Sequence, residues 1–205
     1  MIPVSVTSIG YSAFHNSVSL TSLEFGSGSG LKKIDTSAFR SVGFTGVEIP
    51  ASVTSIKYSV FYDCDSLTSV RFEPNSLLQT LSNRVFHHSA ITAIMIPAST
   101  TFIDSLAFSG LSNLKVYVEY GNTMSISPGS NVAFYGATSA TVVTMSCDGG
   151  AVSSNGTLFV SNVITEIPAN SFKSCSILSS IVFESESNLQ VLGDHSFYDS
   201  GLGNI

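Results

Sequence analysis

Histidine, cysteine and serine are the residue types in this chain that could support catalysis or metal binding. The four histidines are His15, His87, His88 and His195. A zinc site needs ligands that converge within a few ångströms. His15 and His87 each follow a recurring phenylalanine three repeats apart, so strands stacked at about 4.8 Å would separate them by about 15 Å. His87 and His88 are adjacent and form no pair on a helix face. We therefore expect no metal site and no cofactor.

The abundant serines also lack a catalytic context. No serine stands in a G-x-S-x-G motif, and no serine or cysteine has a histidine and an aspartate at matching repeat positions. The glycine run from Gly26 to Gly30 is not followed by the helix or the lysine of a phosphate-binding loop, and it is better interpreted as a flexible turn. We expect no catalytic residue and a protein that is not an enzyme.

The three cysteines permit at most one disulfide and one free thiol. Cys64 and Cys175 both stand three places after a recurring phenylalanine, where other repeats carry Ser17 and Ser89. A small residue that repeats in register is typical of a packing position. The sequence therefore predicts a structural role for Cys64 and Cys175, and it leaves the role of Cys147 open.

The element that positions all of these residues is a repeat of 22 to 25 residues. Its markers are Phe14, Phe39, Phe61, Phe86, Phe108, Phe134, Phe172 and Phe197, and the first intervals are 25, 22, 25 and 22 residues. An apolar residue stands five places before nearly every marker, as in Ile9, Ile34 and Ile56. Sequence periods of this size are typical of solenoids, in which each turn buries its apolar side against its neighbours.

Each marker is followed by a cluster of the form L-x-x-L-x-L, such as Leu67, Val70 and Phe72. Its last positions alternate between apolar and variable residues, which predicts a short strand with one side in the core. Pro3, Pro50 and Pro97 fall 47 residues apart, so two alternating units make up the true period. We predict a single domain over residues 1–205 with about eight turns, one parallel concave sheet, and short 3₁₀ or irregular convex segments.

The repeat resembles the BspA-like subclass of leucine-rich repeats. The consensus I-P-x-S-V-T-S-I-x-x-x-A-F-x-x-C-x-x-L-T-S-V-x-F recurs over residues 2–119 and 164–205. The resemblance implies a surface or secreted protein of anaerobic bacteria or mucosal protozoan parasites that adheres to host cells, extracellular matrix proteins or other microbes. The segment starts and stops inside repeats, so we expect natural flanks, such as a signal or an anchor, outside it.

Composition excludes several classes of partner. Eight Lys and Arg against 14 Asp and Glu give a formal net charge of -6, without the basic patch that nucleic-acid binding requires. Anionic membrane surfaces are equally unsuitable, and no apolar run approaches the length of a membrane span. The segment also lacks a signal peptide. We expect neither nucleic-acid binding nor direct membrane insertion by this segment.

The repeat weakens at about 119–163, where we predict an irregular insertion. Asn155-Gly156 between apolar runs indicates a hairpin, which is either an ordinary decoration or a projection that binds a ligand. Similar hairpins are inserted in BspA-like proteins. Asn155 also begins an N-x-T sequon and is a candidate glycosylation site if the protein is secreted.

The residue between the two core positions of each strand should point outward. This rule selects a column of candidate protein-binding residues on the concave face: Glu24, Glu48, Arg71, Met95, Tyr117 and Val182. Concave solenoid faces commonly bind extended partners. We predict a cell-surface adhesion or protein-recognition module whose partner, by resemblance, is a host-cell or matrix protein. The alternatives are a structural stalk that associates end to end and an intracellular scaffold.

Overall fold

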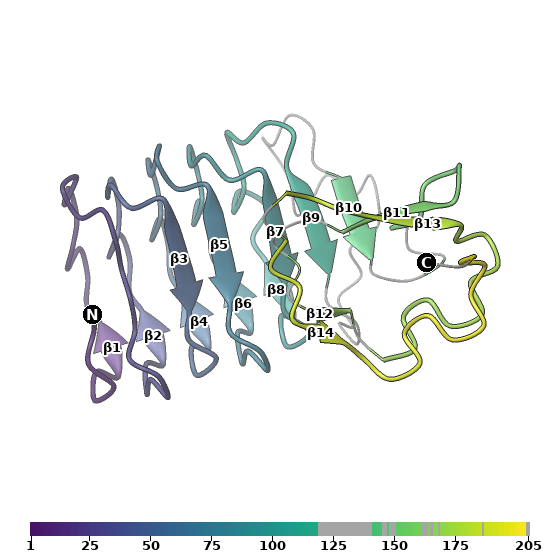
Figure 1. Ribbon diagram of the computed structural model, residues 1–205. Helices are drawn as coiled ribbons and strands as arrows, with labels where there is room; N and C mark the ends of the chain where they lie inside the picture. Colours follow the sequence, from purple (N-terminus) through teal and green to yellow (C-terminus); the bar gives the residue numbers. More distant parts are fainter. Residues whose placement is uncertain are drawn as a thin grey trace.

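The structure is a computed structural model that describes residues 1–118, 141–144, 147, 151–160, 164, 166–167, 169–185 and 187–203. These residues form a succession of short strands and turns, without a helix. Every strand pairing is parallel, and each turn of the chain advances the stack by one strand (Figure 1). The predicted solenoid is therefore confirmed.

Each regular turn contributes two strands, one to each of two rows, where the sequence predicted one sheet. The first row contains strands of two residues, in the order β1 (Ser8–Ile9), β2 (Lys33–Ile34), β4 (Ser55–Ile56), β6 (Thr80–Leu81) and β8 (Phe102–Ile103). These strands contain the apolar position five places before each phenylalanine. Ile34, Ile56 and Leu81 are fully buried there, so packing makes this segment extended.

The second row contains the four-residue strands expected from the L-x-x-L-x-L clusters. β3 (Gly46–Ile49) pairs with β5 (Ser69–Phe72), and β7 (Ala93–Ile96) pairs with β9 (Lys115–Val118), which pairs with β10 (Thr141–Thr144). The register places Val47 beside Val70, and Ile94 beside Val116. Equivalent apolar residues therefore lie in continuous rows, and a shift by one residue would turn each row out of the core.

The phenylalanine turn, five residues centred on each recurring phenylalanine, connects the two rows. It is not a 3₁₀ segment in any described repeat. Its first and last residues have left-handed backbone conformations in every described repeat except at Leu106, as at Ser59 (φ 53°) and Asp63 (φ 52°). The backbone N–H groups of Ser59, Phe61 and Asp63 donate to carbonyls of the next turn, at 3.1, 2.8 and 3.0 Å. The predicted irregular segment is thus a third hydrogen-bonded ladder.

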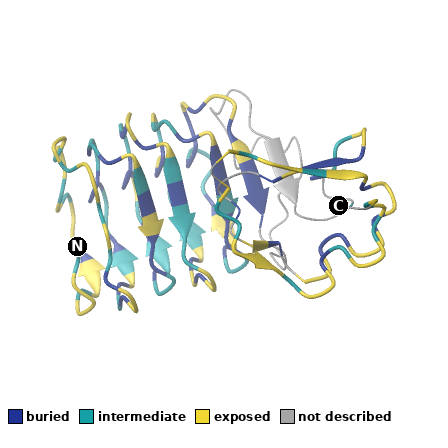
Figure 2. Cartoon of the chain, in the orientation of Figure 1, coloured by how far each residue is buried: buried dark blue, intermediate teal, exposed yellow. Residues whose placement is uncertain are grey.

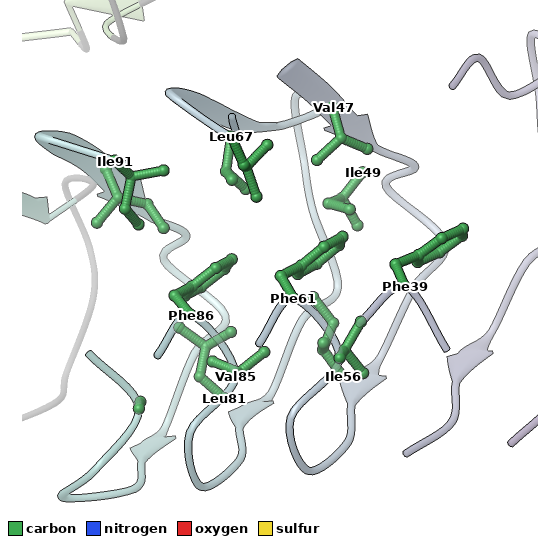
Figure 3. Packing of buried hydrophobic residues seen from close by; sticks show 14 of the residues in the cluster. Phe39, Val47, Ile49, Ile56, Phe61, Leu67, Leu81, Val85, Phe86 and Ile91 are labelled. Carbon is green, nitrogen blue, oxygen red and sulfur yellow. The ribbon is translucent and has the colours of Figure 1, made fainter. Parts of the chain in front are cut away.

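The recurring phenylalanines form a stacked column along the core (Figure 3). The ring centroids of Phe39, Phe61 and Phe86 lie 5.8 and 5.6 Å apart, with interplanar angles of 5° and 2°. All three rings are fully buried. Offset stacking of this kind contributes about 0.5–1.5 kcal/mol per pair beyond the burial of apolar area.

The C-terminal turns form a second block that does not extend the stack directly. Its strands are β11 (Thr157–Val160) paired with β13 (Ser180–Phe183), and β12 (Glu166–Ile167) paired with β14 (Val191–Leu192). No pairing among the described strands joins β10 to β11. The buried core of this block includes Ala93 and Tyr117, and Lys115 forms an ion pair with Glu184 at 3.6 Å. The block therefore packs against the outer side of β7 and β9 (Figure 1).

The predicted insertion at 119–163 lies partly outside the described residues. Its described hairpin is a tight turn in which Val152 and Leu158 form an antiparallel bridge. The Gly156 N–H donates to the Ser153 carbonyl at 2.9 Å, and Gly156 has a φ of 78°. The second arm of this hairpin is β11, which also pairs in parallel with β13. That arm is consequently a strand of the repeat, and the irregular interval ends before it.

The cysteines form one disulfide and leave one free thiol, which is the most that three cysteines permit. Cys64 is buried and free, as its packing position indicated. Cys175 is buried too, and it is bonded to Cys147, whose role the sequence left open, with 5.6 Å between their Cα atoms. The equivalent position faces the core in both repeats, but only at Cys175 does another segment bring a second cysteine within reach.

Candidate protein-binding surface

Glu48 and Arg71 form the centre of the candidate surface. They are direct register partners on β3 and β5, and they lie between rows of buried residues that fix the direction in which they point. Glu48 is exposed and Arg71 is partly exposed, whereas Val47 and Val70 beside them are buried. Alternation along the strand thus places an acidic and a basic side chain on the outer side, as predicted.

The Arg71 side chain has hydrogen-bonding capacity that the described residues do not use. Its Nε atom is buried and has no hydrogen-bond partner among them, and no ion pair in the described part of the chain joins Arg71 to Glu48. An unpaired buried donor costs about 1–3 kcal/mol.

Met95 and Tyr117 do not belong to an open surface, which corrects the predicted six-residue column. They are register partners on β7 and β9. Tyr117 is only 3% exposed, and Met95 is partly buried against the same core cluster. Strand alternation does point both side chains away from the first core, but the C-terminal block covers them.

Glu24 and Val182 lie at separate places. Glu24 is exposed in the first turn, where its carbonyl accepts the Ile2 N–H at 2.7 Å. Val182 is on β13 beside Phe159 of β11, and the two side chains are 44% and 50% exposed. The structure therefore places Glu48 beside Arg71 and Val182 beside Phe159, a residue outside the predicted column. No other two residues of that column lie side by side on an exposed part of the described surface.

A cluster on the phenylalanine turns escaped the sequence analysis. The Arg40 guanidinium lies 4.4 Å from the Tyr62 ring centroid, and the Tyr62 ring lies 4.7 Å from that of His87. Asp63 contacts Arg40 at 3.5 Å and His88 at 3.4 Å. Arg40, Tyr62 and His87 each follow a recurring phenylalanine directly, so the repeat register was the signal that could have revealed their proximity.

His87 also contacts a serine, which raises the question of catalysis. Its Nδ1 atom lies 2.6 Å from the Ser109 hydroxyl oxygen. The nearby carboxylate of Asp63 contacts His88 instead of His87, so the relay of a serine hydrolase is not assembled. Partial burial lowers the pKa of His87, and the neighbouring His88 acts in the same direction. The contact is accordingly a hydrogen bond between adjacent turns.

Asn155, the candidate glycosylation site, lies exposed at the hairpin turn. Its side-chain oxygen accepts a hydrogen bond from the Thr157 backbone N–H at 3.3 Å. The Thr157 hydroxyl is within 2.9 Å of the Ser180 hydroxyl and is largely buried. Modification of Asn155 stays a prediction, supported by its exposure.

The described part of the chain has neither a metal-binding cluster nor a membrane-spanning helix. No group of three or more His, Cys, Asp or Glu side chains there could hold a metal ion. The same residues include no helix long and apolar enough to cross a bilayer.

Solved structures share this architecture. The crystal structure of the pneumococcal vaccine antigen PcpA is 25% identical and has a TM-score of 0.57, over 97% of this chain and 47% of that one. A leucine rich cell surface protein from Faecalibacterium prausnitzii is 23% identical, with a TM-score of 0.47, over 94% of this chain and 55% of that one. This chain thus spans about half the length of each. No curated protein matches it significantly.

The repeat itself is matched by a family model. The model of the BspA type leucine rich repeat region matches residues 1–115 and 151–205 in six copies, where the phenylalanine markers suggested about eight turns. The match covers well over half of the chain and includes β11, in agreement with the parallel pairing of that strand. The chain belongs to the BspA type leucine-rich repeat family.

Proposed function

We propose that this chain is a non-enzymatic recognition module, exposed at the cell surface or secreted, that binds a host-cell or extracellular-matrix protein through Glu48 and Arg71. The observation that carries the proposal is their side-by-side position on β3 and β5, where the register places an exposed acidic side chain beside a partly exposed basic one. Gly46 and Ser69 are register partners on the same side and leave room for a partner backbone. Small neighbours around a charged pair favour approach by an extended protein segment.

Support for a surface protein comes from the family and from its structural neighbour. PcpA, to which this chain is similar over 97% of its length, is a pneumococcal vaccine antigen. Membership of the BspA type family implies adhesion to host-cell or matrix proteins. The regular core and the variable outer positions fit a scaffold that keeps its shape while its binding face changes.

Binding to immobilised matrix proteins and to host epithelial cells tests the proposal. The test variant combines Glu48→Arg with Arg71→Glu, which preserves the net charge. The matched control combines Lys32→Glu with Asp65→Arg, two exposed residues outside the strands, and makes the same charge changes elsewhere. A third variant, Phe159→Ser with Val182→Ser, removes the exposed apolar pair on β11 and β13.

We expect saturable binding that the test variant weakens at least about tenfold, while the control and the thermal midpoint stay unchanged. Loss of binding only in the Phe159 and Val182 variant would move the site to the C-terminal block and refute the role of Glu48 and Arg71. Absence of binding by the unmodified chain to every matrix protein and cell type would refute the adhesion proposal.

A further inference from the structure

The phenylalanine turns of the middle repeats bring charged and aromatic side chains together on one ridge. We define the turn ridge by the polar and aromatic residues of three successive turns: Arg40, Tyr62, Asp63, Arg84, His87 and His88. Exposed residues are frequent along the turns of the solenoid (Figure 2), and Arg84 and His88 are among them. Each of the three turns has a hydrogen-bonded neighbour on both sides, so the ridge lies inside the stack.

Contacts between the turns hold these side chains in one row. The Arg40 guanidinium lies over the Tyr62 ring, the Tyr62 ring contacts His87, and the ring centroids of His87 and His88 lie 3.9 Å apart. The next turn has Gly110 at the position of His88, and a Cβ atom there would collide with the His88 ring. The row is therefore packed, and its cations and rings have fixed relative positions.

The turns themselves do not require the two arginines. Arg84 has a left-handed backbone conformation (φ 54°), and its equivalents in the three preceding turns are serines: Ser12, Ser37 and Ser59. The position of Arg40 holds histidine, tyrosine or serine in the other turns of the regular stack. Stacking of the turns consequently does not explain why both positions carry a guanidinium.

The turn ridge is positively charged, although the whole chain has a formal net charge of -6. It holds two arginines against the single carboxylate of Asp63, which Arg40 and His88 share. Arg84 contacts the uncharged Tyr58 hydroxyl at 3.4 Å, and no ion pair in the described part of the chain includes Arg84. This local excess of positive charge favours an anionic ligand.

Acidification makes the ridge more positive. Partial burial lowers the pKa of His87, as do the neighbouring His88 and Arg84, whereas hydrogen bonding to Ser109 and the charge of Asp63 raise it. The following turn supplies the Ser109 hydroxyl and no charged group. His87 therefore gains its proton only below about pH 6.5, and a bound anion would favour the protonated form.

The backbone of the ridge is closed to an added peptide strand. The N–H groups of Ser59, Phe61 and Asp63 are already paired with carbonyls of the next turn. A peptide that binds through its own backbone needs unpaired N–H and C=O groups on the surface that receives it. The ridge presents side chains instead, which suits a linear ligand that is recognised by its anionic groups.

We propose that the turn ridge binds an acidic polysaccharide, a glycan that carries sulfate or carboxylate groups, along the axis of the solenoid. Arg40 and Arg84 would pair with its anions, because a guanidinium matches sulfate and carboxylate groups with two parallel hydrogen bonds. The exposed rings of Tyr58 and His88 offer apolar faces to the sugar. Successive turns about 4.8 Å apart place these groups in a row that a linear polymer can follow.

Surface plasmon resonance with immobilised heparin, and with neutral dextran as the blank, tests the proposal. The test variant combines Arg40→Gln with Arg84→Ser, the residue type of the preceding turns. The matched control combines Lys32→Gln with Lys173→Gln, two exposed lysines outside the ridge, and makes the same charge change. Circular dichroism checks that each variant is folded.

We expect the arginine variant to bind heparin at least about tenfold more weakly, while the lysine control changes the affinity less than about twofold. Asp63→Asn should strengthen binding about two- to threefold, because it removes the carboxylate that competes for Arg40. Asparagine tolerates the left-handed backbone at this position (φ 52°), so folding should persist. A purely structural role of the ridge would not produce this gain.

The pH dependence is a separate readout. Heparin keeps its charge between pH 7.5 and pH 5.5, so binding of the unmodified chain should strengthen as the histidines gain protons. His87→Gln combined with His88→Asn should remove this increase. An unchanged pH dependence in that variant would contradict a contact of the histidines with the anions.

Absence of heparin binding by the unmodified chain at pH 5.5 and low salt would overturn the proposal. Equal losses in the arginine variant and the lysine control would also overturn it, since they would indicate unspecific attraction. Poly-glutamate that binds as tightly as heparin would refute the assignment to a glycan. Glu48→Arg combined with Arg71→Glu should leave heparin binding unchanged, so this inference and the proposed protein-binding surface succeed or fail separately.

Discussion

Replacement of Phe61 by alanine should destabilise the protein more than the same replacement of Phe14, although both mark the same repeat position. Phe61 is fully buried, is stacked on Phe39 and Phe86, and has an edge contact with Phe44 at 6.3 Å. Removing a buried phenylalanine costs about 3–5 kcal/mol. Phe14 is partly buried and has one stacking partner, so about half that cost, roughly 1.5–2.5 kcal/mol, is expected.

Urea denaturation followed by far-ultraviolet circular dichroism measures this difference. Phe61→Leu serves as the control, because it retains an apolar side chain of similar volume and should cost less than Phe61→Ala. The reasoning would be refuted if Phe61→Ala and Phe14→Ala lowered the free energy of unfolding equally, since stacking on both faces would then contribute nothing.

Three further predictions concern the cysteines and His87. Reduction of the Cys147–Cys175 disulfide, or Cys147→Ser, should destabilise the C-terminal block by about 3–4 kcal/mol, because the bond closes a loop with a sequence separation of 28. Denaturation with and without reductant measures this loss of stability. Burial raises the pKa of the Cys64 thiol from 9.0 to about 11, so at the same pH its thiolate fraction falls about a hundredfold, and iodoacetamide should label it only on unfolding. The pKa of His87 is lowered in the folded chain, so the unfolded chain binds the proton of this histidine more readily. The thermal midpoint should therefore fall as the pH drops through about 6.5, and it should fall less in His87→Gln. A difference in thermal midpoint between the two proteins that does not change with pH would contradict this.

The repeat register also indicates which surface residues on successive turns are neighbours. Residues directly after each phenylalanine stack from turn to turn, which brings Arg40, Tyr62 and His87 together. Their sequence separations of 22 and 25 residues look unrelated without the register. Once the solenoid is assumed, equal positions on successive turns must be neighbours, because every described strand pairing is parallel and in register.

The sequence by itself determined the solenoid, the period of its phenylalanines, the strand alternation and the outward direction of Glu48 and Arg71. Those features follow from contacts between adjacent turns, which the period encodes. Only the tertiary structure decided that the C-terminal block covers Tyr117 and that Cys175 is bonded to Cys147. Both depend on contacts across the interval where the repeat weakens, and a period carries no information about how the chain returns after its register is interrupted.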